Sequence, residues 1–313
     1  MTRRVFRFLH PAAGCALVLA AMIASAAAME GGQTPSVRGY RDFLSGALPP
    51  PGLYLREDTY IYRGTERSTI PQGQLRIDLS AVANIMNATI VTQYQILGGH
   101  YAFAVRGAVT DISATQSVAL NQPRVTMSRI GSLNALSDIV VSPLIIGWHS
   151  GNFHWNVAAT AWLPAGDYDK TRLVSTGKNF LSVAPQFGAT YFDPNAGWEV
   201  SATSIYIVSY ENTATHYHSG DVVQFDFAAG KTIAPQFKLG VVGYYLQQVT
   251  PDSGIGAILG DRKLRVAGAG PAASFSFSLN NVPMTLLAKY HREFSAQNTT
   301  QGGAGTLSIR ASF

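Results

Sequence analysis

Apolar and polar residues alternate one by one along most of this chain, and that period of two restricts the fold more than any other feature. Phe153, Trp155 and Val157, for example, alternate with His154 and Asn156. Successive side chains of a β-strand point to opposite faces of the sheet, so such a run predicts a strand with one apolar and one polar face. Segments of this kind lie near 55–63, 74–85, 88–97, 100–110, 138–149, 152–163, 180–191, 197–209, 222–229, 236–248, 264–278 and 283–294, with 304–313 as a thirteenth candidate.

Composition indicates what the apolar faces meet. Only 13 % of the residues are charged while 47 % are hydrophobic, whereas an ordinary soluble domain carries about 25 % charged residues. The stretch 79–105 lacks Asp, Glu, Lys and Arg, but Asn84, Gln93 and His100 make it too polar for a lipid-facing helix. The strand pattern and the low charge together indicate a sheet whose outer face lies in lipid.

A sheet in lipid must close on itself, because every backbone N–H and C=O has to be paired there. We therefore predict an all-β chain whose residues 53–313 form a closed antiparallel transmembrane β-barrel. A bacterial single-chain barrel has an even number of strands, so one of the early pair of segments is expected to be miscounted, giving about 12 strands. The alternative is a soluble periplasmic β-sandwich, which shares the alternation but would carry more Lys and Glu on its wet face.

The first 28 residues have the three parts of a secretory signal peptide. Arg3, Arg4 and Arg7 form a basic start, 12–24 is apolar, and 26–28 offers a run of alanines for cleavage near Ala28. An uncleaved inner-membrane anchor is the alternative, but its apolar core is short for a span of about 20 residues. We expect export of the remainder to the outer membrane of a Gram-negative bacterium.

The sole cysteine, Cys15, lies inside this signal. It follows Ala13 and Gly14 but comes too early in the apolar stretch for a lipoprotein acylation site. After cleavage, the chain has no disulfide, thiol nucleophile or thiolate metal ligand. The surplus of basic residues also falls in or near the signal, so nucleic-acid binding is not expected.

Three segments do not have the pattern of barrel wall. Residues 29–52 are rich in Gly and Pro, and this segment is a candidate plug inside the barrel, with Phe43, Leu48 and Tyr54 as its apolar contacts. Residues 111–137 have no clean period, so we expect a loop with a short helix there, and 250–261 is rich in turn residues.

The chain ends on alternating residues, Leu307, Ile309 and the aromatic Phe313. This ending is similar to the C-terminal signal of bacterial outer-membrane barrels, which the barrel assembly machinery reads. The barrel's partners are then expected to be outer-membrane lipid, that machinery and a solute.

Several local motifs resemble a bacterial outer-membrane family named for the meta-pathway of phenol degradation. The motifs are Glu30–Gly32, Ala47–Tyr54, Asp138–Leu144, Gly147–His149, Leu163–Tyr168, Asn212 with Thr213, Tyr217–Asp221, Gly243–Tyr245 with Gln248, Asp252–Gly254, Gly270 with Pro271, and Glu293 with Phe294 and Asn298. They keep the family's order over nearly the whole chain, but Thr299 and Thr300 stand where a basic residue often follows the Asn. The resemblance implies an outer-membrane barrel that passes aromatic or other hydrophobic compounds, with no catalytic residues to carry over.

The polar face of each strand supplies candidate residues for the solute path. If the apolar faces meet lipid, the lumen is lined by Arg76, Asp78, Arg106, Glu199, Lys238, Lys289, His291, Glu293 and Arg310, with His218 and Asp221 as further candidates. Both signs of charge occur, so paired charges are favoured over a ring of one sign. The tryptophans Trp148, Trp155, Trp162 and Trp198 fit interfacial girdles, although a Trp could equally stack on an aromatic solute.

Two kinds of chemistry remain as alternatives. A Ser/His hydrolase is disfavoured because neighbours such as His149 and Ser150 point to opposite faces of a strand. His216 and His218 share a face near Asp221 and could hold zinc or copper, but solvated groups at a barrel rim are the simpler interpretation. We therefore expect no cofactor and no metal.

The function predicted from these features is an outer-membrane channel or transporter for small hydrophobic or aromatic compounds, feeding their catabolism. The chain is not expected to be an enzyme. The alternatives are a non-conducting structural barrel and, less favoured, a lipid-processing barrel enzyme.

Overall fold

The computed structural model describes residues 29–70, 73–121, 124–257 and 262–313, so the expected signal peptide lies outside the described residues. A short 3-10 helix, η1 (Glu30–Gly32), precedes the strands. These are β1 (Gly52–Ile70), β2 (Gly73–Ile96), β3 (Gly99–Leu120), β4 (Val125–Leu136), β5 (Ile139–Ser150), β6 (Phe153–Leu163), β7 (Ser182–Asp193), β8 (Trp198–Ser209), β9 (Val222–Ala234), β10 (Phe237–Gln248), β11 (Arg265–Leu279), β12 (Val282–Gln297) and β13 (Gln301–Ser312). No helix in this described part is long and apolar enough to cross a membrane.

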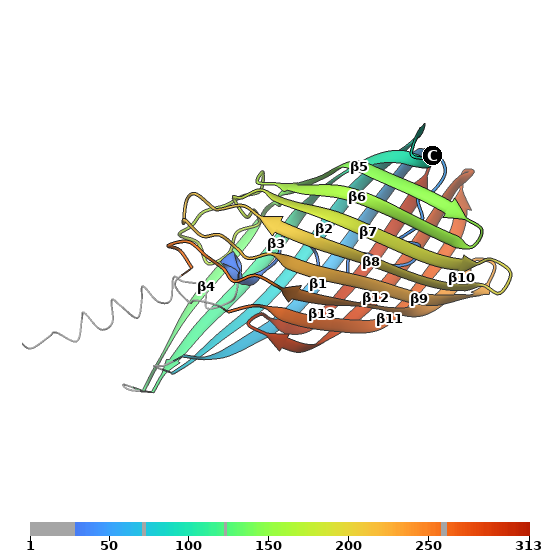
Figure 1. The fold of residues 1–313 in the computed structure, drawn as a ribbon. Coiled ribbons are helices and arrows are strands. Elements are labelled where there is room, and N and C mark those ends of the chain that lie inside the picture. Colours follow the sequence, from blue (N-terminus) through green and yellow to red (C-terminus); the bar gives the residue numbers. More distant parts are fainter. Residues whose placement is uncertain (1–28, 71–72, 122–123, 258–261) are drawn as a thin grey trace, which may run out of the picture.

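The sheet is antiparallel and closed (Figure 1). It closes because β1 pairs with β2 on one side and with β13 on the other, from Tyr54 opposite Ser312 to Thr65 opposite Gln301. On the edge away from β2, β3 pairs with two strands in succession. His100–Arg106 pair with β5, and Val109–Leu120 pair with β4. β4 and β5 therefore act as one wall strand interrupted at Ser137 and Asp138. Counted this way the barrel has 12 strands, as the sequence predicted.

The structure explains the extra segment and corrects one prediction. The expected strands 74–85 and 88–97 are a single long strand, β2. The expected loop with a short helix at 111–137 is wrong, because β3 runs on to Leu120 and β4 follows it. Arg129 interrupts the apolar residues on one face of β4, and Ile130 and Leu136 lie among polar residues on the other face, so the sequence pattern that marks a strand is weak.

The two ends of the barrel differ. Short turns join the strands at one end, here called the turn end, at 97–98, 151–152, 194–197, 235–236 and 280–281. The opposite end, the loop end, carries the long connections 164–181, 210–221 and 249–264. Beyond it β1, β2, β3 and β4 extend further than the other strands (Figure 1). The beginning of β1 and the C-terminus both lie at the turn end, where Leu53 and Phe313 exchange backbone hydrogen bonds.

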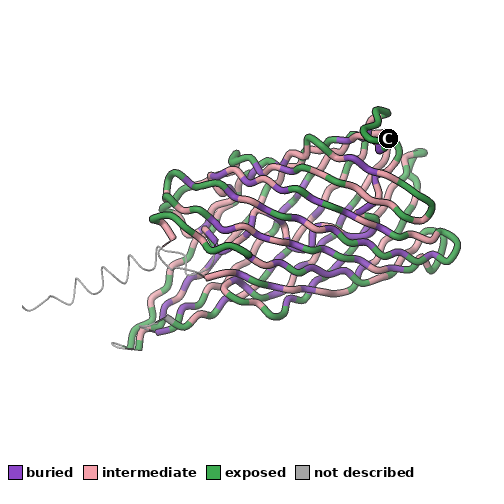
Figure 2. The backbone as a smooth tube through the Cα atoms, viewed as in Figure 1, coloured by how far each residue is buried: buried purple, intermediate pink, exposed green. Residues whose placement is uncertain are grey.

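The outer face of the wall is apolar. Buried and exposed residues alternate along the strands (Figure 2), and Phe187, Val200, Val241 and Leu307 are among the exposed large side chains. Such an exterior is unfavourable in water but suits the hydrocarbon band of a membrane. At the turn end Trp148 and Trp155 stack with ring centroids 6.3 Å apart, and Trp198 is half exposed, as expected for an aromatic girdle.

Candidate functional site

The N-terminal residues 30–51 cross the barrel lumen from the loop end to the turn end. Arg38 contacts β12 near the loop end, where its guanidinium lies 2.8 Å from the Glu293 carboxylate. Further along, the backbone N–H of Gly46 donates to Thr190 Oγ1 on β7 at 2.9 Å. Asn156 on β6 donates to the carbonyl of Ser45 at 3.0 Å. The segment is thus hydrogen-bonded to strands on several sides of the wall.

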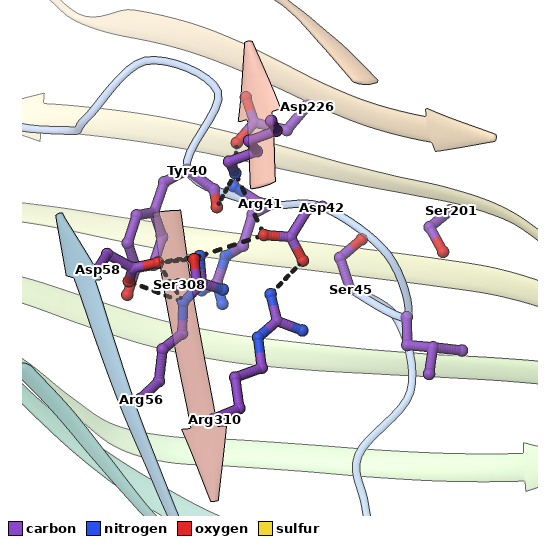
Figure 3. Close-up of polar contacts among 12 residues, drawn as sticks. Tyr40, Arg41, Asp42, Ser45, Arg56, Asp58, Ser201, Asp226, Ser308 and Arg310 are labelled. Carbon is purple, nitrogen blue, oxygen red and sulfur yellow. Dashed lines mark hydrogen bonds and ion pairs between the residues drawn. The ribbon is translucent and has the colours of Figure 1, made fainter. Parts of the chain in front are cut away.

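A cluster of charges around Asp42 attaches this segment at mid-lumen (Figure 3). The Asp42 carboxylate lies 3.1 Å from Arg56, 3.1 Å from Lys289 and 2.5 Å from Arg310. Arg56 also pairs with Asp58 at 2.7 Å. Asp42 is 3 % exposed, so the three cations replace the water that a carboxylate would otherwise need.

Charged side chains from the wall also bind the segment above and below Asp42. Glu293 accepts hydrogen bonds from Arg38, from Tyr62 at 2.8 Å and from Tyr244 at 2.5 Å. Nearer the turn end, Glu199 accepts from the backbone N–H of Leu44 and pairs with Lys238. The lumen's charges are therefore mostly paired.

Apolar side chains of the segment occupy positions where the wall is glycine. Phe43 is buried with Ala228, Val242, Ala272 and Leu287. A Cβ added to Gly230 would lie 2.7 Å from the Phe43 ring, which is too close for carbon atoms, so glycine at this position admits the ring. Leu48 packs in the same way over Gly147, where an added Cβ would lie 2.4 Å from Leu48. Tyr54 belongs to β1 rather than to the segment, and its hydroxyl donates to the Pro50 carbonyl at 2.7 Å.

We expect Gly230→Ala to destabilise the barrel, by about 1–3 kcal/mol, because the methyl group must displace the Phe43 ring. Gly305→Ala is the matched control, since nothing lies within 4 Å of a Cβ built there. Urea unfolding of the refolded protein, followed by tryptophan fluorescence, measures the difference. Equal midpoints for the two variants would contradict the packing of Phe43 against Gly230.

Above the charged cluster, on the loop-end side, lies a cavity of about 590 Å³, which we call the loop-end cavity. Its size is in the range of small-molecule sites. Its walls come from β1 to β6, the loop 164–181, parts of the loops 210–221 and 249–264, and the start of the N-terminal segment. Apolar side chains of this lining include Val37, Ile77, Leu79, Ala83, Ile85, Ala108, Ile112, Val140, Trp162, Leu173 and Val174.

Hydrogen bonds at the loop end hold Met29 and Glu30 beside this cavity. The Glu30 carboxylate accepts from Asn212 at 2.9 Å and from Thr215 at 2.8 Å. The backbone N of Met29 donates to Asp252 Oδ2 at 2.8 Å. Burial and the neighbouring Asp252 raise the pKa of Tyr217 above its ordinary value. Burial lowers the pKa of Lys178, although Asp138 and Glu30 oppose that shift.

The structure places the nine lumen candidates from the strands in three settings. Glu199, Lys238, Lys289, Glu293 and Arg310 contact the N-terminal segment, as described above, and His291 is buried beside the Tyr244 ring, 5.3 Å away. Arg106 alone of these candidates lines the loop-end cavity. Arg76 and Asp78 pair with each other at 2.7 Å with side chains 48 % and 39 % exposed.

The predicted inward orientation of Arg76 and Asp78 is therefore wrong. In this part of β2 the apolar residues point inward instead: Leu75 is buried, and Ile77 and Leu79 line the cavity. The alternation was read correctly but its phase was not, because here the interior is the apolar side.

The last two candidates, His218 and Asp221, lie in the loop 210–221. His218 Nε2 lies 2.8 Å from the Ser209 carbonyl oxygen, and Asp221 accepts from the exposed Tyr206. His216 bonds Glu211 at 3.0 Å, so the two imidazoles engage different partners. Within the described ranges no cluster of three or more His, Cys, Asp or Glu could hold a metal.

Sequence reasoning missed several residues of the interior. Trp162 was assigned to a girdle, yet it is 4 % exposed and lines the cavity. Trp162 lies nine positions after the exposed Phe153 on β6, and an odd separation along a strand puts the two side chains on opposite faces. The sequence therefore did contain a sign that Trp162 points inward. Arg38, Tyr40 and Asp42 carried no signal, because the N-terminal segment has no period.

A closed 12-stranded barrel with an apolar exterior and with its N-terminal chain inside the lumen is the architecture of an outer-membrane β-barrel. More particularly, this chain belongs to the family described as "Putative MetA-pathway of phenol degradation", whose model matches residues 63–309. No curated protein sequence matches the chain significantly.

The solved structure of an outer-membrane channel shows the same fold. The COG4313 outer membrane channel from Pseudomonas putida F1 is similar with a TM-score of 0.67 and 11 % identity, over 86 % of this chain and 97 % of that chain. A FadL homologue from Pseudomonas aeruginosa gives a TM-score of 0.45 and 8 % identity, over 88 % and 93 % of the two chains. The β domain of the Bordetella autotransporter BrkA gives 0.47 and 11 %, over 85 % and 100 %.

Proposed function

We propose that this barrel is an outer-membrane channel or transporter for small hydrophobic or aromatic compounds, with no enzymatic role. The observation that carries the proposal is the loop-end cavity, whose apolar lining includes Ile85, Val140 and Trp162. The cavity of about 590 Å³ can bind an apolar solute against these side chains by removing its surface from water, and charged side chains such as Asp138, Lys178 and Arg262 complete its lining. Family membership and the fold of the P. putida channel support the same proposal.

The orientation follows from the barrel's ends. In outer-membrane barrels the short turns face the periplasm and the longer loops face outward. The loop-end cavity then opens toward the outside, and the N-terminal segment lies between it and the periplasm. We propose that this segment is a plug that must shift for a solute to pass.

The test is uptake into liposomes that contain the full mature chain. A small aromatic compound such as benzyl alcohol is expected to enter faster than a sugar such as xylose, relative to protein-free liposomes. Trp162→Ala should slow the aromatic compound and leave the sugar unchanged, whereas Trp198→Ala, on the exterior, should change neither. Equal enhancement for the two solutes would contradict the proposal.

A non-conducting structural barrel is the second candidate, favoured by the dense hydrogen bonding of the N-terminal segment. Planar-bilayer recordings separate the two functions. Discrete conductance steps from the intact chain support a channel, and their absence together with equal liposome uptake supports the structural barrel.

Cleavage of the signal after Ala28 fits the geometry of Met29. The backbone N of Met29 is 2.8 Å from Asp252 Oδ2, and Met29 is 1 % exposed. Cleavage there would turn this N–H into an ammonium group. Asp252 also accepts from Tyr217 at 2.6 Å and from Gly220 at 2.8 Å, so we propose that the loop cluster holds the new terminus as an ion pair.

Asp252→Asn is expected to expose that terminus, because the ammonium loses its only negative partner in this cluster of contacts. Acylation of the α-amine near neutral pH, read by mass spectrometry, should be slow in the wild type and several-fold faster in the variant. Asp221→Asn, in the same group of loops, is the matched control and should leave the rate unchanged. A mature chain that does not begin at Met29, or equal rates in all three proteins, would contradict the proposal.

A further inference from the structure

The floor of the loop-end cavity combines apolar side chains with one guanidinium. Val37, Ala83, Ile85 and Ala108 line the cavity next to Arg106. Val37, Ala83, Ile85 and Ala108 also pack around Tyr40. The Arg106 guanidinium carbon lies 4.4 Å from the centroid of the Tyr40 ring, so the ring orients the cation.

Arg106 differs from the other cations of the lumen and the cavity lining because, in the described part of the chain, neither a hydrogen bond nor an ion pair holds its guanidinium. Arg41, Arg129, Lys178 and Arg262 have no ion pair there either, but each donates to a neutral group. Arg38, Arg56, Lys238, Lys289 and Arg310 each contact a carboxylate. Among the described residues, no carboxylate lies within ion-pairing distance of Arg106.

The carboxylates that could approach Arg106 already have other partners. Asp42 is surrounded by three cations, and Asp58 accepts from Arg56 and Ser308. Asp226 accepts from the backbone N–H of Arg41 at 3.0 Å and from Gln224 at 2.9 Å. None of these groups can turn toward Arg106 without leaving another buried polar group unpaired.

Several acidic residues line the cavity itself. Asp138, just before the neighbouring strand β5, already accepts from the backbone N–H groups of Gly166 and Lys178. Glu30 and Asp252 are hydrogen-bonded within the loops.

Glu66, which also lines the cavity, lies far from Arg106. Arg106 is level with Arg56 across β2, through Asn87. Glu66 is ten residues further along β1, about 33 Å at the usual strand rise. It therefore belongs to the opposite end of the cavity.

Resting on the proposed function, we propose that Arg106 binds the anionic group of the solute, and that the site takes small monocarboxylates with an apolar body. The carboxylate would receive two parallel N–H hydrogen bonds from the guanidinium, a geometry that arginine offers and lysine does not. The apolar body would lie against Ile85, Val140 and Trp162. A neutral solute of the same shape would fill the cavity without satisfying Arg106.

Binding to the purified full mature chain in detergent tests this inference by isothermal titration calorimetry. Benzoate is the anionic aromatic probe, hexanoate the aliphatic one, and benzyl alcohol the neutral isostere. Benzoate should bind about tenfold or more tightly than benzyl alcohol, in line with a hydrogen bond to a charged group. The ratio of benzoate to hexanoate affinity shows whether the body of the solute is aromatic or aliphatic.

Arg106→Gln should remove that tenfold preference and leave the affinity for benzyl alcohol unchanged, while Arg106→Lys should retain part of it. Arg76→Gln is the matched control, because Arg76 pairs with Asp78 away from the cavity, and it should behave as the wild type. Retention of the heat-modifiable gel shift shows that each variant is folded, and Arg106→Lys gives the readout if Arg106→Gln does not fold.

Equal affinity for benzoate and benzyl alcohol in the wild type would overturn the Arg106 proposal and leave the proposed function standing. An equal loss of both affinities in Arg106→Gln would do the same. If neither probe binds and benzyl alcohol enters liposomes no faster than xylose, the proposed function itself fails.

Discussion

Deletion of residues 30–48 is expected to raise the single-channel conductance of the barrel by about an order of magnitude. These residues occupy the lumen between the loop-end cavity and the turn end, and a 12-stranded barrel is wide enough to conduct water and ions once such a segment is removed. The deletion keeps the signal, Met29 and the residues that lead into β1. Planar-bilayer recording measures the change, and a conductance equal to that of the intact chain would contradict a plug.

A disulfide lock provides the control in the full chain. Thr203 Oγ1 on β8 donates to Ser45 Oγ at 3.0 Å, and the chain has a single cysteine, within the expected signal. The pair Ser45→Cys and Thr203→Cys can therefore form one defined bond between the N-terminal segment and the wall. If the segment must move, oxidation should slow benzyl alcohol uptake several-fold and reduction should restore it. Unchanged uptake on oxidation would show that solutes pass with the segment in place.

The wall was predictable from sequence because each strand carries its own signal. Lys289, Glu293 and Arg310 were assigned to the interior from parity alone, and the structure places them there. The alternation was weaker in the part of β3 and β4 that extends beyond the loop end. There Ser113, Ser117 and Ser128 replace apolar residues, so β4 was read as a loop.

Alternation along a strand does not predict which face points outward when both the lipid and the cavity are apolar. Leu75, Ile77 and Leu79 satisfied the rule for lipid-facing residues, yet they cover the inner side of β2. The cavity could not be found from the sequence for the same reason. Its lining joins β2, β3 and β6 with a loop, and no local pattern marks residues that meet only after the sheet closes.

The charged cluster was half predictable. Arg310 and Lys289 were expected to be paired, but their shared partner Asp42 lies 268 and 247 positions earlier in the chain. Asp42 belongs to the N-terminal segment, which has no regular alternation of apolar and polar residues. The direction of its side chains could therefore not be predicted. What the sequence lacked was the path of that segment through the lumen.

Replacing Asp42 tests whether this path is held by charge. Asp42→Asn leaves Arg56 and Arg310 (Figure 3), and also Lys289, facing a neutral amide. Breaking a buried ion pair from one side costs about 3–5 kcal/mol, because the remaining charges stay desolvated and unpaired. We expect urea unfolding to show a loss of that size and, if the N-terminal segment is a plug, bilayer recordings to show frequent openings, since the segment loses its attachment at mid-lumen.

Asp78→Asn is the same substitution in the exposed pair with Arg76, and it should cost at most about 1 kcal/mol. Adding Arg310→Gln to Asp42→Asn removes one of the uncompensated cations. The double variant should therefore be more stable than the sum of the two single changes predicts. If Asp42→Asn and Asp78→Asn are equally mild, the segment is held by packing of Phe43 and Leu48 rather than by charge. In that case Gly230→Ala should be the more damaging substitution.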